Sequence, residues 1–219
     1  MAMKSVDVSK GKLRGTYMAI LIPLGVAINL VGGQVAGRLQ LPLFMDSIGT
    51  AIIAAIMGPF IGAVSGVLYN IIASIIGGNM VASLFGICNI ATAFIVGFMA
   101  QGGKFKTVVH AIIATVAVAL ANAILGAPIA IVVYGGIQGS GVDVAVAGLL
   151  ALGNDILSAA FIARVPINLA DKGIAVFVAW LILKRLPANM QGLAGGKAKV
   201  GGKIDSGEKT AGEGPEGQG

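Results

Sequence analysis

The chain has 219 residues, of which 57% are hydrophobic and 11% charged, with a formal net charge of +6 and a mean hydropathy of +0.94. These values lie outside the range of ordinary soluble domains and therefore exclude that class. A single cysteine, Cys88, excludes an intramolecular disulfide and a CxxC metal site. The basic excess does not indicate nucleic acid, because no basic groove with interleaved aromatic residues accompanies it.

Residues 47–103 contain no Asp, Glu, Lys or Arg. A bilayer core of about 30 Å takes roughly 20 apolar residues per helix, so this run is long enough for two to three crossings. The sequence therefore predicts an all-α, polytopic membrane protein with about six transmembrane helices. In chain order, the predicted spans are at about 15–33, 43–57, 60–76, 82–100, 108–134 and 174–186.

Three segments lie outside these spans. Residues 1–14 are short and polar, and we expect a cytoplasmic N-terminal segment before a membrane domain at 15–187. Residues 188–219 are rich in Gly, Lys, Glu and Ser, which predicts a disordered cytoplasmic tail. Residues 142–170 are apolar but carry charges, and we interpret them as an amphipathic or re-entrant cap. An extra crossing there is the alternative, but it would bury Asp155 near mid-membrane, which is costly for an unpaired charge.

Basic residues in short loops favour the cytoplasmic side. With the N-terminus inside and six spans, the basic residues of the N-terminus, of the loop at 104–106 and of Lys184 and Arg185 all lie inside. Arg38, Arg164 and Lys172 lie outside. This bias predicts that both termini are cytoplasmic.

In this topology the polar residues of the spans gather near the outer side. Polar groups inside a membrane usually face a cavity or each other. The pattern predicts an outward-facing pocket for a small, partly polar molecule. Hydrogen bonding between helices is the alternative for any single residue. The predicted substrate-binding residues are Asn29, Gln34, Asp46, Asn70, Asn89, Tyr134 and Gln138.

Small residues recur at spacings of four in the inner halves of the spans, which lets another helix approach closely. The motifs include Gly15, Ala19, Gly58, Gly62 and Gly66. They fit either packing within the chain or a docking face for a partner membrane protein. Sequence motifs for catalysis, for a metal site or for ATP hydrolysis are not found, so we expect no enzyme, no metal and no cofactor.

The segments LPLFMDSIGTAIIAAIMGPFIGAVSGVLYNIIASIIGG and DKGIAVFVAWLILKRLP resemble the substrate-binding S components of energy-coupling factor (ECF) vitamin transporters. The stretch VYGGIQGSGVDVAVAGLLALG is also similar to members of that group. The resemblance covers about residues 15–187. It implies six helices, cytoplasmic termini and a micronutrient site near the outer face. It also implies small-residue contacts to a transmembrane T component that two ATPase subunits drive.

The leading interpretation is thus a substrate-binding subunit of an ATP-driven importer in a bacterial cytoplasmic membrane. Its expected partners are a small-molecule micronutrient, the T component, the two ATPases and the lipid bilayer, with no nucleic acid. A membrane sensor or scaffold domain, and a small stand-alone secondary transporter, remain as alternatives.

Overall fold

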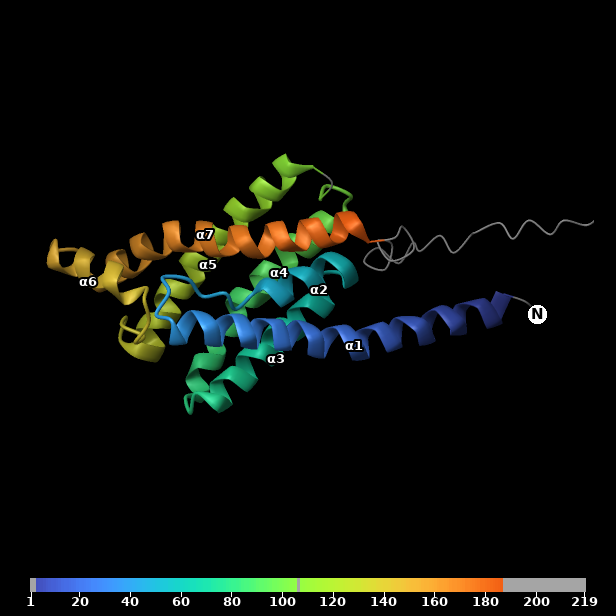
Figure 1. Ribbon diagram of the computed structural model, residues 1–219, viewed down its shortest axis with the longest axis horizontal. Helices are drawn as coiled ribbons and strands as arrows, with labels where there is room; N and C mark the ends of the chain where they lie inside the picture. Colours follow the sequence, from blue (N-terminus) through green and yellow to red (C-terminus); the bar gives the residue numbers. More distant parts are fainter. Residues whose placement is uncertain (1–2, 106, 187–219) are drawn as a thin grey trace, which may run out of the picture.

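Figure 1 shows a computed structural model of the protein, which describes residues 3–105 and 107–186 and, from residue 14 onward, the surroundings of the side chains. The described part is helical and contains no strand. The expected disordered tail at 188–219 lies outside the described residues. The elements are α1 (Met3–Arg38), α2 (Ile48–Met57), α3 (Pro59–Ile76), the 3-10 helix η1 (Met80–Phe85), α4 (Gly86–Gln101), α5 (Val108–Tyr134), α6 (Asp143–Ala151) and α7 (Ile156–Arg185).

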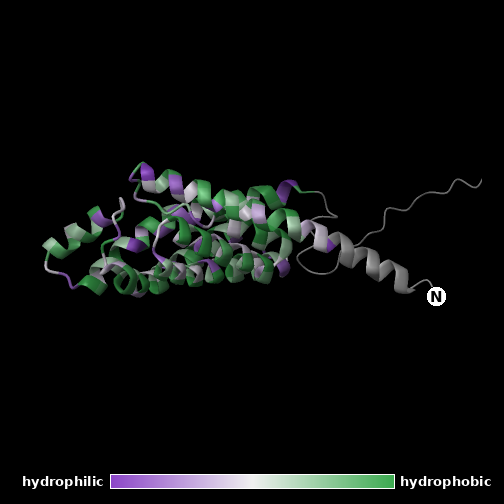
Figure 2. Ribbon diagram, turned by 90° about the horizontal axis from the view of Figure 1, so that it is seen from below, coloured by the Kyte–Doolittle hydropathy of each residue, from purple (hydrophilic) through white to green (hydrophobic). Residues whose placement is uncertain are grey.

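Five stretches are long and apolar enough to cross a membrane: Arg14–Arg38 of α1, α3, Met80–Gln101, α5 and α7. Leu, Ile and Val side chains cover much of their outer faces, and hydrophobic colouring dominates the bundle in Figure 2. The 10-residue α2 is different, because the side chains from Gly49 to Met57 are all buried. It is surrounded by protein on every side. This architecture is consistent with the predicted polytopic membrane protein.

The helix boundaries depart from the predicted spans at three places. The first span was predicted at 15–33, but α1 runs from Met3 to Arg38 and so includes most of the predicted N-terminal segment. The second span was predicted from residue 43, but α2 begins at Ile48. Residues 39–47 instead form a non-helical linker, in which Gln40 and Met45 both have φ of 51°. The last span was predicted from residue 174, and this is wrong, because α7 is one continuous helix from Ile156.

The segment predicted as a cap at 142–170 is therefore divided between the short α6 and the first half of α7. Asp155 is the N-cap of α7. Its Oδ1 accepts hydrogen bonds from the backbone N–H groups of Leu157 and Ser158, both at 3.0 Å. Its Oδ2 accepts from Ser158 Oγ at 2.6 Å. These hydrogen bonds hold the pKa of Asp155 below its ordinary value, and the bond from the Ser158 side chain has the largest effect. Asp155 thus satisfies the free donors at a helix start.

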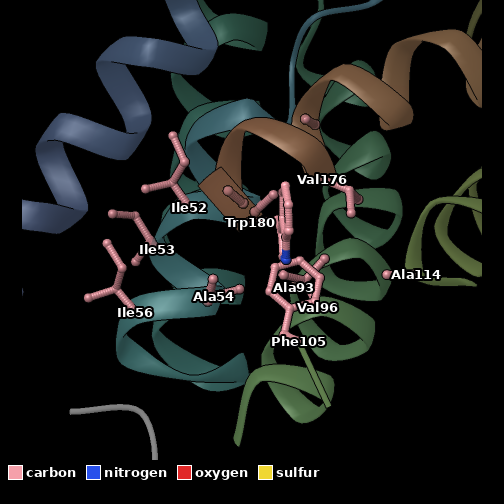
Figure 3. Close-up of a cluster of buried hydrophobic side chains, with 14 of the residues drawn as sticks. Ile52, Ile53, Ala54, Ile56, Ala93, Val96, Phe105, Ala114, Val176 and Trp180 are labelled. Carbon is pink, nitrogen blue, oxygen red and sulfur yellow. The ribbon is translucent and has the colours of Figure 1, made fainter. Parts of the chain in front are cut away.

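A hydrophobic core joins α2, α4, α5 and α7 (Figure 3). Trp180 of α7 lies among side chains of the other helices and is 7% exposed. Alanines dominate the α5 and α7 contact faces, so these two helices pack closely along their lengths. The core residues labelled in Figure 3 are Ile52, Ile53, Ala54, Ile56, Ala93, Val96, Phe105, Ala114, Val176 and Trp180.

The two ends of the bundle differ in charge. Figure 1 shows that α1 begins and α7 ends at the same end of the molecule, near the α4–α5 connection. The exposed basic side chains Arg14, Lys104, Lys184 and Arg185 belong to these segments. The end of α1, the end of α5 and α6 lie at the opposite end, where the candidate site is found.

Candidate functional site

A cavity of about 200 Å³ lies at this second end of the bundle. Its walls come from the 39–47 linker, the C-terminal half of α3, η1 and the end of α5 with the loop after it. These segments are distant in sequence, and the helix packing brings them together. The lining residues are Phe44, Asp46, Tyr69, Asn70, Ala73, Ser74, Gly77, Asn79, Ala82, Phe85, Tyr134 and Gln138.

Of the predicted substrate-binding residues, Asp46, Asn70, Tyr134 and Gln138 all line this cavity. Asn70 donates one hydrogen bond from Nδ2 to Gly66 O at 2.9 Å within its own helix. Gln138 Nε2 is buried and has no hydrogen-bond partner among the described residues. Amides with unused hydrogen-bonding capacity are what a partly polar ligand requires.

The other three predicted residues lie elsewhere. Asn29 is fully buried and joins α1 to α2: its Nδ2 donates to Thr50 Oγ1 at 2.8 Å, and its Oδ1 accepts from Gly49 N at 2.7 Å. Asn89 lies behind the cavity wall, where Nδ2 donates to the backbone oxygen of Asp46 at 3.4 Å. Gln34 is exposed in a separate shallow groove along α1. For Asn29, interhelical hydrogen bonding accounts for the burial.

A buried charge cluster adjoins the cavity at Asp46, the one member of the cluster that lines it. Lys172 of α7 is 1% exposed, and its Nζ lies 2.8 Å from Asp46 Oδ1 and 2.7 Å from Asp171 Oδ2. The same ammonium donates to Ser47 Oγ at 2.9 Å. Two carboxylates and one hydroxyl thus surround one cation, which is the arrangement that makes a buried charge tolerable.

Asp171 also fixes the linker that forms one wall. Its Oδ1 accepts hydrogen bonds from the backbone N–H groups of Phe44 at 3.2 Å and Met45 at 2.6 Å. Met45 has a positive φ, a conformation that costs a non-glycine residue energy and needs support from its surroundings. Asp171 supplies this support and so places Asp46 at the cavity.

A second, much smaller cavity of about 20 Å³ lies beside the first. The two share Phe44, Asp46 and Phe85 in their walls, so they adjoin at these side chains. The Phe44 ring is near two cations, with Arg164 Cζ at 6.0 Å and Lys172 Nζ at 5.6 Å from its centroid. The remaining walls are formed by Cys88, Asn122, Gly126, Arg164, Asn168 and Lys172.

Sequence reasoning missed the α7 contribution to this site. Lys172 was interpreted only as a loop charge, and Asp171 was not identified as a site residue. The usable signal was the adjacent Asp-Lys pair in an otherwise apolar stretch, with Asp46 as another isolated charge to pair with it. Ionisable residues inside a membrane span are candidates for function and need partners.

The predicted partner-interface residues lie in three different environments. Gly15 and Ala19 are exposed on α1. Gly58 has φ of 93° and forms the tight turn between α2 and α3. A Cβ added to Gly62 would lie 2.5 Å from Ala54 Cβ, and one added to Gly66 would lie 2.7 Å from Asn89 Cβ. Gly62 and Gly66 are therefore occupied by packing within the chain.

In the part of the chain that the structure describes, no group of three or more His, Cys, Asp or Glu side chains is placed to hold a metal ion. No protein-family model matches the chain, and no curated protein or solved structure matches it.

Proposed function

We propose that this protein is the membrane-embedded substrate-binding subunit of an ECF-type, ATP-driven importer of a vitamin or related micronutrient. The observation that carries the proposal is the cavity at one end of the bundle, which is lined by four segments distant in sequence and whose Asp46 pairs with the buried Lys172. A site of this size and mixed polarity suits a small, partly polar molecule. The segments that resemble ECF S components, quoted above, supply three of these walls and Lys172, the partner of Asp46.

The proposal places the protein in a bacterial cytoplasmic membrane, with six crossings, of which the 39–47 linker and the buried α2 together form the second. The exposed basic residues Arg14, Lys104, Lys184 and Arg185 gather at the end away from the cavity. By the positive-inside rule this end is cytoplasmic, and the cavity then opens outward.

Labelling tests this orientation. In a Cys88→Ala background, a membrane-impermeant maleimide added outside cells should label Gln138→Cys but not Lys104→Cys. Labelling of Lys104→Cys alone would place the cavity on the cytoplasmic side and contradict an import site.

The function itself is tested with purified protein. The full chain should co-purify with, or bind, one micronutrient, as native mass spectrometry from lipid nanodiscs would reveal. Proteoliposomes should accumulate that compound only when the T component, the ATPases and ATP are all present. Accumulation by the chain alone would contradict the proposal.

A small secondary transporter is the second candidate, because one observation favours it. Asp171 and Lys172 lie near the middle of α7 and pair with Asp46, and charges inside a membrane often mark proton or ion paths. In this case accumulation would need an ion gradient rather than ATP. A protonophore would abolish it, whereas omission of the ATPases would not.

A further inference from the structure

Arg164 is a buried cation that forms no ion pair with a described residue. It is 1% exposed and lies two turns into α7. Its Nη1 donates to Ala160 O of its own helix at 3.3 Å, while Nη2 is buried with no hydrogen-bond partner. The ion pairs between described residues all belong to Lys172, so no described carboxylate contacts Arg164.

An arginine does not escape this situation by losing its proton, because the guanidinium stays charged under all ordinary conditions. A buried charge that lacks both an ion pair and its full set of hydrogen bonds is destabilising. Proteins retain such a group where something outside the chain completes it. The unpaired Nη2 of Arg164 therefore indicates a missing anionic partner.

The small inner cavity is where this partner fits. Arg164, Asn168 and Lys172 are spaced by four residues, so they lie along one face of α7, and all three line the cavity. The Asn168 side chain, 2% exposed, forms no hydrogen bond to the described residues. The inner cavity has a volume of about 20 Å³, which exceeds the roughly 10–15 Å³ that one water-sized group needs.

The α5 wall leaves this space open. A Cβ added to Gly126 would lie 3.6 Å from Arg164 Nε and 3.7 Å from Cys88 Sγ. An alanine there would make ordinary contacts, so glycine is not required for packing. Because glycine has no methyl group at this position, space remains beside the Arg164 guanidinium.

We propose that the ligand of the outer cavity is a compact carboxylic acid whose carboxylate enters the inner cavity and pairs with Arg164. A carboxylate matches the fork of a guanidinium, and its two oxygens accept from Nη2 and from the Asn168 amide. This inference rests on the proposed function, in which the outer cavity is the substrate site.

The rest of the ligand lies in the outer cavity. Its walls present Phe44, and the rings of Phe85 and Tyr134, which are stacked at 6.3 Å with an interplanar angle of 25°. The cavity volume is about 200 Å³, somewhat above the roughly 150 Å³ of an apolar cavity that holds benzene. The ligand body is therefore about the size of one or two rings.

Matched acid and amide pairs test the charge requirement. The full chain in phosphatidylcholine nanodiscs is titrated with benzoate and benzamide, nicotinate and nicotinamide, indole-3-acetate and indole-3-acetamide, and biotin and biotinamide. Thermal unfolding and calorimetry report binding. At least one acid should bind at least tenfold more tightly than its amide.

Variants then locate the charge. Arg164→Gln should abolish the preference for the acid, and Arg164→Lys should retain part of it. Gly126→Ala fills the inner cavity without touching the charge, so it should weaken binding of the acid at least tenfold while the protein stays folded. Gly173→Ala, at an α7 glycine whose added Cβ would meet only Thr115 at 3.6 Å, is the matched control and should leave binding unchanged.

The inference is overturned if the amides bind as well as the acids, if no acid binds, or if Gly126→Ala and Arg164→Gln both bind the acid like the parent protein. Displacement of the acid by phosphatidylglycerol in the nanodiscs would also overturn it, because a lipid headgroup would then be the partner of Arg164. These outcomes differ from failure of the proposed function. A neutral compound that drives ATP-dependent uptake refutes only the carboxylate, whereas ATP-independent uptake of an acid refutes only the importer.

Discussion

The buried charge cluster gives the most direct test of how the site is built. Lys172→Met removes the one cation that contacts Asp46, Asp171 and Ser47. Asp171 is 1% exposed, so its charge would remain buried with only backbone donors. Removing one partner of a buried pair typically costs about 3–5 kcal/mol. We expect this loss in the free energy of unfolding, which corresponds to more than a hundredfold change in the unfolding equilibrium.

The double variant Lys172→Met with Asp171→Asn separates charge from shape. Asparagine keeps the Oδ1 acceptor for the backbone N–H groups of Phe44 and Met45, but it removes the buried negative charge. Removing both charges of a buried pair is often close to neutral. The double variant should therefore be more stable than Lys172→Met alone, with a residual cost of about 1–2 kcal/mol.

The single Trp180 makes the measurement simple, because it lies in the core and is the only tryptophan of the chain. Its fluorescence can follow equilibrium unfolding as SDS is titrated into mixed micelles. Lys104→Met, at an exposed loop position, is the control and should stay within about 0.5 kcal/mol. The reasoning is refuted if Lys172→Met costs less than about 1 kcal/mol, or if the double variant is no more stable than the single one.

Two further predictions concern helix packing. Gly62→Leu places a large side chain against α2 and should lower the free energy of unfolding by about 1–3 kcal/mol or more. Ala19→Leu, on the exposed face of α1, should leave the free energy of unfolding unchanged but reduce co-purification with a T component. Normal co-purification of Ala19→Leu would show that the partner docks elsewhere. Asn29→Ala leaves the Gly49 N–H and the Thr50 hydroxyl without a partner and should cost about 1–3 kcal/mol for each unsatisfied group. The ligand affinity of Asn29→Ala should not change. Gln34→Ala, at an exposed position of the same helix, is the control for stability. A loss of affinity in Asn29→Ala with normal unfolding would contradict the structural role of Asn29.

The polar residues illustrate what sequence reasoning can and cannot decide about the site. Asp46, Asn70, Tyr134 and Gln138 were grouped because each lies near the same end of its span, and the structure places them around one cavity. Asn29 satisfied the same criterion but bonds α1 to α2. Depth along a span follows from position in the sequence, whereas the direction in which a side chain points depends on which helices become neighbours.

By itself, the sequence determined that the protein is helical and built for a membrane, and it placed most of the helices. Apolar runs and the turn residues between them are local signals, so α3 and α5 begin and end close to the predicted bounds. Local signals were insufficient for α7, where charged residues interrupt the apolar pattern at Arg164, Asp171 and Lys172.

Only the tertiary structure decided that these charges belong inside. Lys172 and Asp46 are 126 positions apart, and the sequence around each residue does not indicate that the other is its partner. A charge in an apolar helix is unfavourable alone and favourable when another segment completes it. The same holds for Gly62, whose small size suits a partner protein or a neighbouring helix equally well until the packing of α2 is known. Helix formation and membrane insertion depend mainly on each segment's own residues, whereas a binding site depends on contacts between segments, and these contacts exist only in the folded molecule.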